Sequence, residues 1–223
     1  MNDLVLKLQN DVKNHPVLES EWIIRKQNKM DLDDLLLWLS QEYFVSIGFV
    51  DWFLIVAAKT TNQRAKIVLV ENIWEELGEG KIEDTHVSIL IEFLAKLGVN
   101  YESNQILPET KLYLDKMSKI INQGFYFGLG ALGPANEYLL KLEYSKISDS
   151  YQILKTNMNL PEGKFFQVNL DADEGHSKRL FDLIADTALE EQSKNEVILG
   201  NKMALDARKL FYEGLIRVEL TKT

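Results

Sequence analysis

Residues 31–59 read DLDDLLLWLSQEYFVSIGFVDWFLIVAAK, and this stretch decides the fold class. Its apolar residues recur mostly every three or four positions, which is the spacing of a helix with a buried face. Asp31 and Asp34 can cap the first turn of such a helix. The most apolar part, residues 45–58, is shorter than the roughly 20 residues that cross a bilayer. The pattern therefore predicts a long core helix over residues 32–59.

The rest of the chain follows the same helical spacing, and its glycines and prolines fall between the periodic segments. Strand-like runs at residues 67–70 and 197–199 lie inside longer helical patterns and are interpreted as helix. No repeat, low-complexity tract or linker divides the sequence. We expect one all-α domain over residues 1–223, with a helix opening at Pro16 and others over residues 62–74, 83–98, 108–124, 125–146, 164–191 and 195–220.

Composition excludes several classes of protein. The 25 basic and 34 acidic residues give a net charge of −9 and form no basic cluster, so nucleic acid is not an expected partner. The chain has no cysteine, which rules out disulfides, thiolate metal sites and a cysteine nucleophile. Its opening, MNDLVLKLQNDVKNHP, lacks the pattern of a secretion signal. We therefore expect a cytoplasmic protein without a membrane partner.

His176 stands near other polar residues at helical spacing. In FFQVNLDADEGHSKRL, Asn169, Asp173 and His176 are related as i, i+4 and i+7 and so share one face of the predicted helix. Aspartate and histidine are common iron ligands, and one helix can bring both to a shared ion across this spacing. An ordinary polar face of an amphipathic helix gives the same spacing. The segment alone indicates a candidate metal site without deciding it.

His86 follows a run of acids in ENIWEELGEGKIEDTH. Glu76, Glu79 and Glu83 would all lie broadly on its face if one helix continued through the two glycines of this segment. The glycines make that continuity doubtful, and acidic surface helices often produce such spacings. A metal site and a solvated face both remain open here.

Glu137 lies in FGLGALGPANEYLLKLEY, whose small residues would let another helix or a ligand approach the backbone. Tyr144, seven residues later, shares its face, whereas Glu143 lies about 120° away and is expected to be exposed. Asp51, inside an apolar run, is expected to be a hydrogen-bonded core residue rather than an outer ligand. His15 precedes a proline and is expected to start a helix, with no cofactor role.

These segments in this order resemble the heme-oxygenase-like diiron oxygenases, also called iron-containing redox enzymes, over nearly the whole chain. The segment HPVLESEW resembles the opening helix of that family, and DLDDLLLWLSQEYFVSI resembles its second helix. The segment ENIWEELGEG, together with His86, resembles the first metal signature, and HVSILIEFLAKLGVN resembles the continuation of that helix. The middle helix supplies Glu137. The last family signature is His, three residues, Asp, two residues, His, and it falls here on Asn169, Asp173 and His176.

The resemblance implies a multi-helix bundle of about seven core helices around a central metal and substrate cavity. The implied metal ligands are His86, Glu137, Asp173, His176 and one acid before His86. For that acid we favour Glu76, because it follows the family-like run that starts at Asn72. Glu79 and then Glu83 remain alternatives.

The implied activity is that of a non-heme iron oxygenase or oxidase, which uses Fe²⁺ and dioxygen on a small amino-acid-like or fatty-acid-like molecule. Asn169 stands where the family has histidine, and a carboxamide is a weaker ligand than imidazole for a transition metal. Whether one or two irons bind is therefore left open. A homodimer is expected only by analogy with the fold.

Three other functions compete with this one. A non-catalytic binding or interaction protein could keep the fold and a partial acidic site. The thiaminase-like branch of the same fold uses a cysteine nucleophile, which this chain lacks. Heme binding would need an axial ligand on the opening helix, where His15 is the candidate, and would leave the acids around His86 and His176 without a role.

Overall fold

The structure is a computed structural model that describes residues 2–222, apart from the side chains of residues 172–174 and 222. Its described residues form helices and turns, without a strand. The α-helices are α1 (Asp3–Lys13), α2 (Glu21–Lys26), α3 (Leu32–Ala58), α4 (Gln63–Glu76), α5 (His86–Lys96), α6 (Pro108–Ile121), α7 (Phe125–Leu132), α8 (Leu139–Met158), α9 (Lys164–Thr187) and α10 (Glu191–Lys222). Short 3₁₀ turns are η1 (Pro16–Glu19), η2 (Gly78–Gly80), η3 (Ile82–Asp84) and η4 (Tyr101–Ser103), and η5 (Gly133–Tyr138) is a π-helical turn. The predicted all-α class is confirmed.

Helix α3 begins at its predicted start because two aspartates form a capping box. Asp31 Oδ1 accepts the backbone N–H of Asp34 at 2.9 Å, and Asp34 Oδ2 accepts that of Asp31 at 3.2 Å. Such reciprocal bonds satisfy donors that the first turn would otherwise leave free. By length and composition α3 could cross a membrane, but a core helix passes the same test, and this one is packed against α4, α5, α6 and α7.

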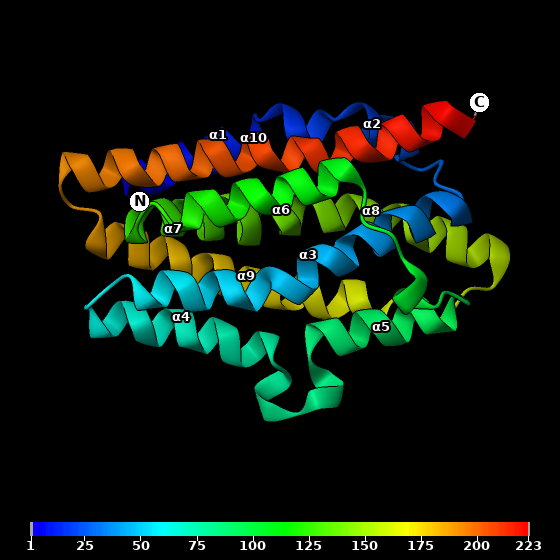
Figure 1. The fold of residues 1–223 in the computed structure, drawn as a ribbon, viewed down its shortest axis with the longest axis horizontal. Coiled ribbons are helices and arrows are strands. Elements are labelled where there is room, and N and C mark those ends of the chain that lie inside the picture. Colours follow the sequence, from blue (N-terminus) through cyan, green and yellow to red (C-terminus); the bar gives the residue numbers. More distant parts are fainter. Residues whose placement is uncertain (1, 223) are drawn as a thin grey trace.

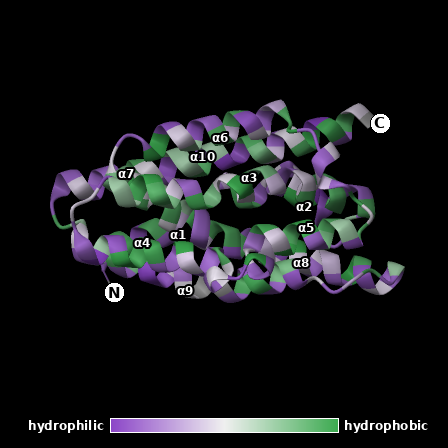
Figure 2. Ribbon diagram, turned by 60° about the horizontal axis from the view of Figure 1, so that its bottom comes forward, coloured by the Kyte–Doolittle hydropathy of each residue, from purple (hydrophilic) through white to green (hydrophobic). Residues whose placement is uncertain are grey.

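The helices are arranged in layers around α3 (Figure 1). Helix α10 runs along α7 and α6 on one side, while α4 and α5 lie on the other side next to α9. Hydrophobic and hydrophilic residues alternate along most of the helices, as expected where one side of a helix faces the core (Figure 2). Helices α7 and α10 cross closely because both carry glycine: a Cβ on Gly130 would lie 2.0 Å from the carbonyl oxygen of Val197.

Helices α7 and α8 are continuous through the π-helical turn η5. Pro134 lies in this turn and cannot donate a backbone hydrogen bond. The side-chain amide of Asn136 donates to the carbonyl oxygen of Ala131 at 2.6 Å, inside the bundle. Single π turns inside α-helices are frequent at functional sites, and Glu137 lies on this one.

Two helix predictions fell short. Helix α1 was not predicted, although Leu4, Leu8 and Val12 bury one of its faces. Helix α8 continues past residue 146 to Met158 because Ile147, Tyr151 and Leu154 extend its buried face. Both segments look polar on average, so only the spacing of their few large apolar residues marks them as helix.

Candidate metal centre

Three helical segments bring Glu76, Glu137 and His176 together. Glu76 is the last residue of α4, Glu137 lies on the π turn η5, and His176 lies in the middle of α9. One ligand atom from each residue lies within 4.8 Å of the others. The side chains of Glu137 and His176 are buried, and that of Glu76 is 10% exposed. The cluster is therefore enclosed by the bundle rather than spread over its surface.

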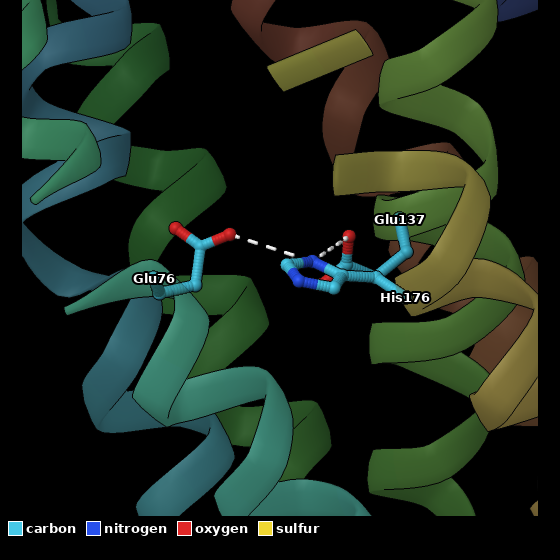
Figure 3. Close-up of side chains that lie close together, drawn as sticks. All are labelled: Glu76, Glu137 and His176. Carbon is cyan, nitrogen blue, oxygen red and sulfur yellow. Dashed lines mark hydrogen bonds and ion pairs between the residues drawn. The ribbon is translucent and has the colours of Figure 1, made fainter. Parts of the chain in front are cut away.

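The imidazole of His176 lies between the two carboxylates (Figure 3). Its Nδ1 atom is 3.3 Å from Oε2 of Glu137 and 3.5 Å from Oε1 of Glu76. The other oxygen of Glu76 is 3.0 Å from Nδ1 of His86, which begins α5. Glu76 therefore touches both histidines, and the four side chains form one connected group.

The turn between α4 and α5 places Glu76 beside His86. Gly78, Glu79 and Gly80 have φ values of 63°, 53° and 87°, which turn the chain sharply after α4. Thr85 then caps α5, accepting the backbone N–H of Ser88 at 3.1 Å. The helix is thus broken at the glycines, and it is this break that sets the ends of α4 and α5 side by side.

The other acids that precede His86 point elsewhere. Glu79 and Glu83 are exposed, so of the three alternatives Glu76 is the one that the structure places at His86. Asn169 lines the neighbouring cavity, and its side-chain N–H donates to the carbonyl oxygen of Phe165 at 2.7 Å. The predicted ligand Asp173 belongs to α9, but its side chain lies outside the described residues.

A second set of polar residues, Glu75, Arg179 and Asn72, binds the Nε2 side of His176 directly or through one another. Nε2 of His176 donates to Oε2 of Glu75 at 2.8 Å. The same oxygen accepts from Arg179 at 2.6 Å, and Arg179 also donates twice to Oδ1 of Asn72, at 3.1 and 2.9 Å. Sequence reasoning gave none of these three residues a role. The available signal was only their position in the sequence, three residues after His176 for Arg179 and one before Glu76 for Glu75, and this does not predict that the two side chains meet.

The site is strongly acidic, and this shows in its pKa values. Burial acts to lower the pKa of His176, but the carboxylates of Glu137, Glu76 and Glu75 outweigh it and raise the pKa to about 9. Burial also acts to lower the pKa of His86, but the carboxylate of Glu76 outweighs it and raises this pKa. The carboxylates therefore favour positive charge between them, which a metal cation would supply in place of protons.

The donor set fits a transition metal. Oε1 of Glu137 is buried and has no hydrogen-bond partner among the described residues, whereas Nδ1 of His86 contacts Glu76. A buried carboxylate oxygen without a partner, beside two imidazoles, is a donor that a bound cation would satisfy. Mixed carboxylate and imidazole ligands suit iron and related first-row metals.

A cavity of about 240 Å³ opens beside the cluster. Most of its wall is apolar, with a few neutral polar groups and with Glu76 and His86 among its lining residues. The lining consists of Val45, Ser46, Phe49, Val50, Glu76, Leu77, Ile82, Thr85, His86, Val87, Ser88, Leu140, Tyr144 and Asn169. An apolar chamber next to a polar cluster is the usual form of a site for a small molecule.

Three other sequence interpretations have a structural outcome. Asp51 was expected in the core, and this was wrong, because it is exposed on α3. Glu143 was expected to be exposed, and this was also wrong, because it is fully buried against Arg208. His15 caps η1 as expected: its Nδ1 accepts the backbone N–H of Val17 at 3.2 Å.

A family model described as iron-containing redox enzyme matches residues 36–209, which includes every residue of the cluster. The chain therefore belongs to the iron-containing redox enzyme family. One relative is the 4-chloro-allylglycine synthase of Streptantibioticus cattleyicolor, which is 28% identical over 134 residues. The match covers 58% of this chain and 50% of that enzyme, so the chain matches about half the length of this relative.

Solved structures show the same fold. A CADD-like protein from Nostoc punctiforme superposes with a TM-score of 0.82 at 19% identity, covering 96% of each chain. A TenA homologue from Pseudomonas syringae gives 0.74 at 16% identity over 97% of this chain and 93% of that one. A domain with a heme oxygenase-like fold from Shewanella denitrificans gives 0.70 at 16% identity, over 98% and 92%. The fold is thus heme-oxygenase-like.

Proposed function

We propose that this protein is a non-heme iron oxygenase or oxidase that binds Fe²⁺ with Glu76, His86, Glu137 and His176, and with Asp173 as a further predicted ligand. The observation that carries the proposal is the convergence of Glu76, Glu137 and His176 within 4.8 Å, in a chain of the iron-containing redox enzyme family. Bound ferrous iron would supply the electrons that begin the reduction of dioxygen.

The protein groups hold and orient the ligands. Glu76 can offer one oxygen toward each histidine, since its two oxygens already face His176 and His86 separately. Glu75 binds Nε2 of His176 and so leaves Nδ1 directed at the carboxylates. A hydrogen bond of this kind fixes the ring orientation and raises the basicity of the ligating nitrogen.

The cavity supports a small substrate with an apolar body. None of its lining residues is lysine or arginine. A substrate carboxylate would therefore find its positive partner at the metal end of the cavity, which would orient the apolar part toward residues such as Phe49 and Leu140. An amino-acid-like substrate agrees with the printed name of the Streptantibioticus relative, and a fatty-acid-like substrate fits the same wall.

We further propose that one iron binds firmly and a second binds weakly. Asn169 replaces an expected histidine, and its amide nitrogen is engaged by the Phe165 carbonyl. A carboxamide oxygen remains as its donor, which is a poorer ligand than imidazole. The homodimer and the cytoplasmic location inferred from sequence stay predictions.

Anaerobic ferrous titration tests the proposal directly. The wild type should bind iron and consume dioxygen afterwards, with a change in its optical spectrum. His176→Ala should lose the tight iron, whereas His15→Ala, which alters a histidine far from the cluster in sequence and bonded to Asp206, should not. If neither wild type nor a variant with the family histidine restored binds iron, the non-catalytic binding protein becomes the better explanation.

A further inference from the structure

A second group of charged residues is buried in the core, and the proposed iron chemistry does not use it. We call Glu42, Glu143 and Arg208 the inner ion cluster. Arg208 donates from Nε to Glu143 Oε2 at 3.0 Å and from Nη2 to the same oxygen at 2.9 Å, and Nη2 also donates to Glu42. All three side chains are at most 1% exposed. They join α3, α8 and α10 at the centre of the bundle.

The inner ion cluster has more acid than base. In the ion pairs of the described residues, Arg208 is the one cation that contacts either carboxylate, so two ionised glutamates would leave a net charge of 1 − 2 = −1. An uncompensated charge in a protein interior is strongly unfavourable. The facing groups from other positions are neutral: Tyr113 on α6, Tyr144 on α8, and Tyr212 on α10.

Burial also raises the pKa of both carboxyls. At Glu42 and at Glu143 this effect outweighs the attraction of Arg208, which acts in the opposite direction. Two carboxyls that share one guanidinium titrate as a pair rather than as separate groups. One proton bound by either carboxyl would balance the charge of the cluster and would require no further cation.

Tyr144 connects the inner ion cluster with the cavity. Its hydroxyl donates to Oε2 of Glu42 at 3.3 Å. The same residue lines the cavity together with Glu76 and His86. Tyr113 also faces Arg208, with its ring centroid 5.6 Å from the guanidinium carbon, but it is absent from the cavity wall. Tyr144 is thus the tyrosine that reaches both places.

We propose that Glu42 and Glu143 share one proton in the folded protein, and that Tyr144 passes this proton between the inner ion cluster and the cavity. In the outward step the Tyr144 hydroxyl first turns from Glu42 toward the cavity, so that protonated Glu42 becomes the donor; the O–H bond of Glu42 then breaks and its proton moves to the Tyr144 oxygen. The former hydroxyl proton of Tyr144 moves to a water or a basic substrate atom in the cavity. No electrons are transferred, and the reverse step reloads Glu42. A closed site that reduces dioxygen consumes protons, so this store would serve the proposed function without depending on it.

Infrared spectroscopy of the metal-free protein tests both halves of the proposal. At neutral pH the wild type should show the C=O stretch of a protonated carboxyl, and this band should be lost in Glu143→Gln and in Glu42→Gln, where the remaining glutamate pairs with Arg208 alone. After mixing with D₂O the band should shift quickly in the wild type. In Tyr144→Phe the shift should be slower by at least about tenfold.

Tyr113→Phe is the matched control. It removes a buried hydroxyl beside the same arginine without touching the cavity wall, so its exchange should match that of the wild type. A wild type without the carboxyl band would overturn the shared proton, and wild-type exchange in Tyr144→Phe would overturn the route. If Glu42→Gln does not fold, Glu143→Gln alone can assign the carboxyl band to this pair, because either substitution leaves one carboxylate opposite the single charge of Arg208. Iron binding plays no part in these measurements, so their failure is separate from a failure of the proposed function.

Discussion

Glu75 and His176 are 101 residues apart in the chain, and Oε2 of one lies 2.8 Å from Nε2 of the other. This contact holds the Nε2 edge of the imidazole, while the Nδ1 edge is directed at Glu76 and Glu137. Arg179 donates to the same oxygen, so two partners hold the Glu75 carboxylate. Burial acts to raise the pKa of Glu75, but the nearby positive charges of Arg179 and His176 outweigh it and lower this pKa. Neighbouring residues of one helix thus hold opposite nitrogens of one ring.

Removing this contact should weaken metal binding. We expect Glu75→Ala to lower the affinity for Fe²⁺ by about 10- to 100-fold, because the ring of His176 loses its orientation and some of its basicity. Glu75→Gln keeps an acceptor oxygen and should lose less. Glu71→Ala is the control, since Glu71 is exposed on the same helix. Chelator competition measures the affinities, and equal values for Glu75→Ala and Glu71→Ala would contradict the role.

Restoring the family histidine should strengthen the second iron site. Asn169→His places an imidazole one turn before Asp173 on the same helix, where the carboxamide now donates to Phe165. We expect ferrous titration to show one tight iron in the wild type and two in Asn169→His. Two tight irons in the wild type would show that Asn169 does not limit the site.

The inner ion cluster should make stability depend on pH. A carboxyl whose pKa is raised in the folded state stabilises the fold fully below its unfolded pKa of 4.5, and this contribution is lost as the pH rises through the folded value. Urea unfolding of the metal-free protein between about pH 5 and pH 8 should therefore show a falling contribution from the cluster. Glu143→Gln should flatten the profile relative to the wild type. Parallel profiles for the two proteins would mean that neither glutamate holds the proton.

The crossing of α7 and α10 should not tolerate a methyl group. A Cβ on Gly130 would lie 2.0 Å from the Val197 carbonyl oxygen, so Gly130→Ala must push the helices apart, at a cost of about 1–3 kcal/mol or more in unfolding free energy. Gly48→Ala is the matched control on α3, where a Cβ has nothing within 4 Å. It should stabilise the protein by about 0.5–1 kcal/mol. Thermal or urea unfolding compares the two, and similar stabilities would mean that the bundle relaxes around the added methyl.

The sequence predicted the helical class well because helix signals are local. The capping aspartates of α3 and the spacing of its apolar residues need no knowledge of the rest of the chain. Burial of single charged residues was predicted poorly. Asp51 sits among apolar neighbours yet faces outward, because α3 is apolar on nearly every side, and even Leu54 is half exposed. Glu143 is buried because Arg208, 65 residues later, meets it in the core.

The candidate metal site was predictable in its residue types but not in its geometry. Glu76 was favoured from a resemblance to a family, while the reason it meets His86 is a turn with three left-handed residues. The two glycines predicted a break in the helix, but periodicity does not give the direction in which the chain turns there. The contact of Arg179 with Glu75 depends on how α9 packs against α4, which no local pattern encodes.

The direction of the Glu137 side chain depends on the π turn η5, which holds one more residue than a regular α-helical turn. An α-helix advances by about 100° per residue, so one surplus residue rotates everything that follows it by that amount. Deleting a single residue between Gly133 and Glu137 would let the backbone return to regular α-helical bonding and would swing the carboxylate of residue 137 relative to His176. The chain therefore keeps a locally irregular backbone where a regular helix would direct the buried carboxylate of Glu137 away from His176.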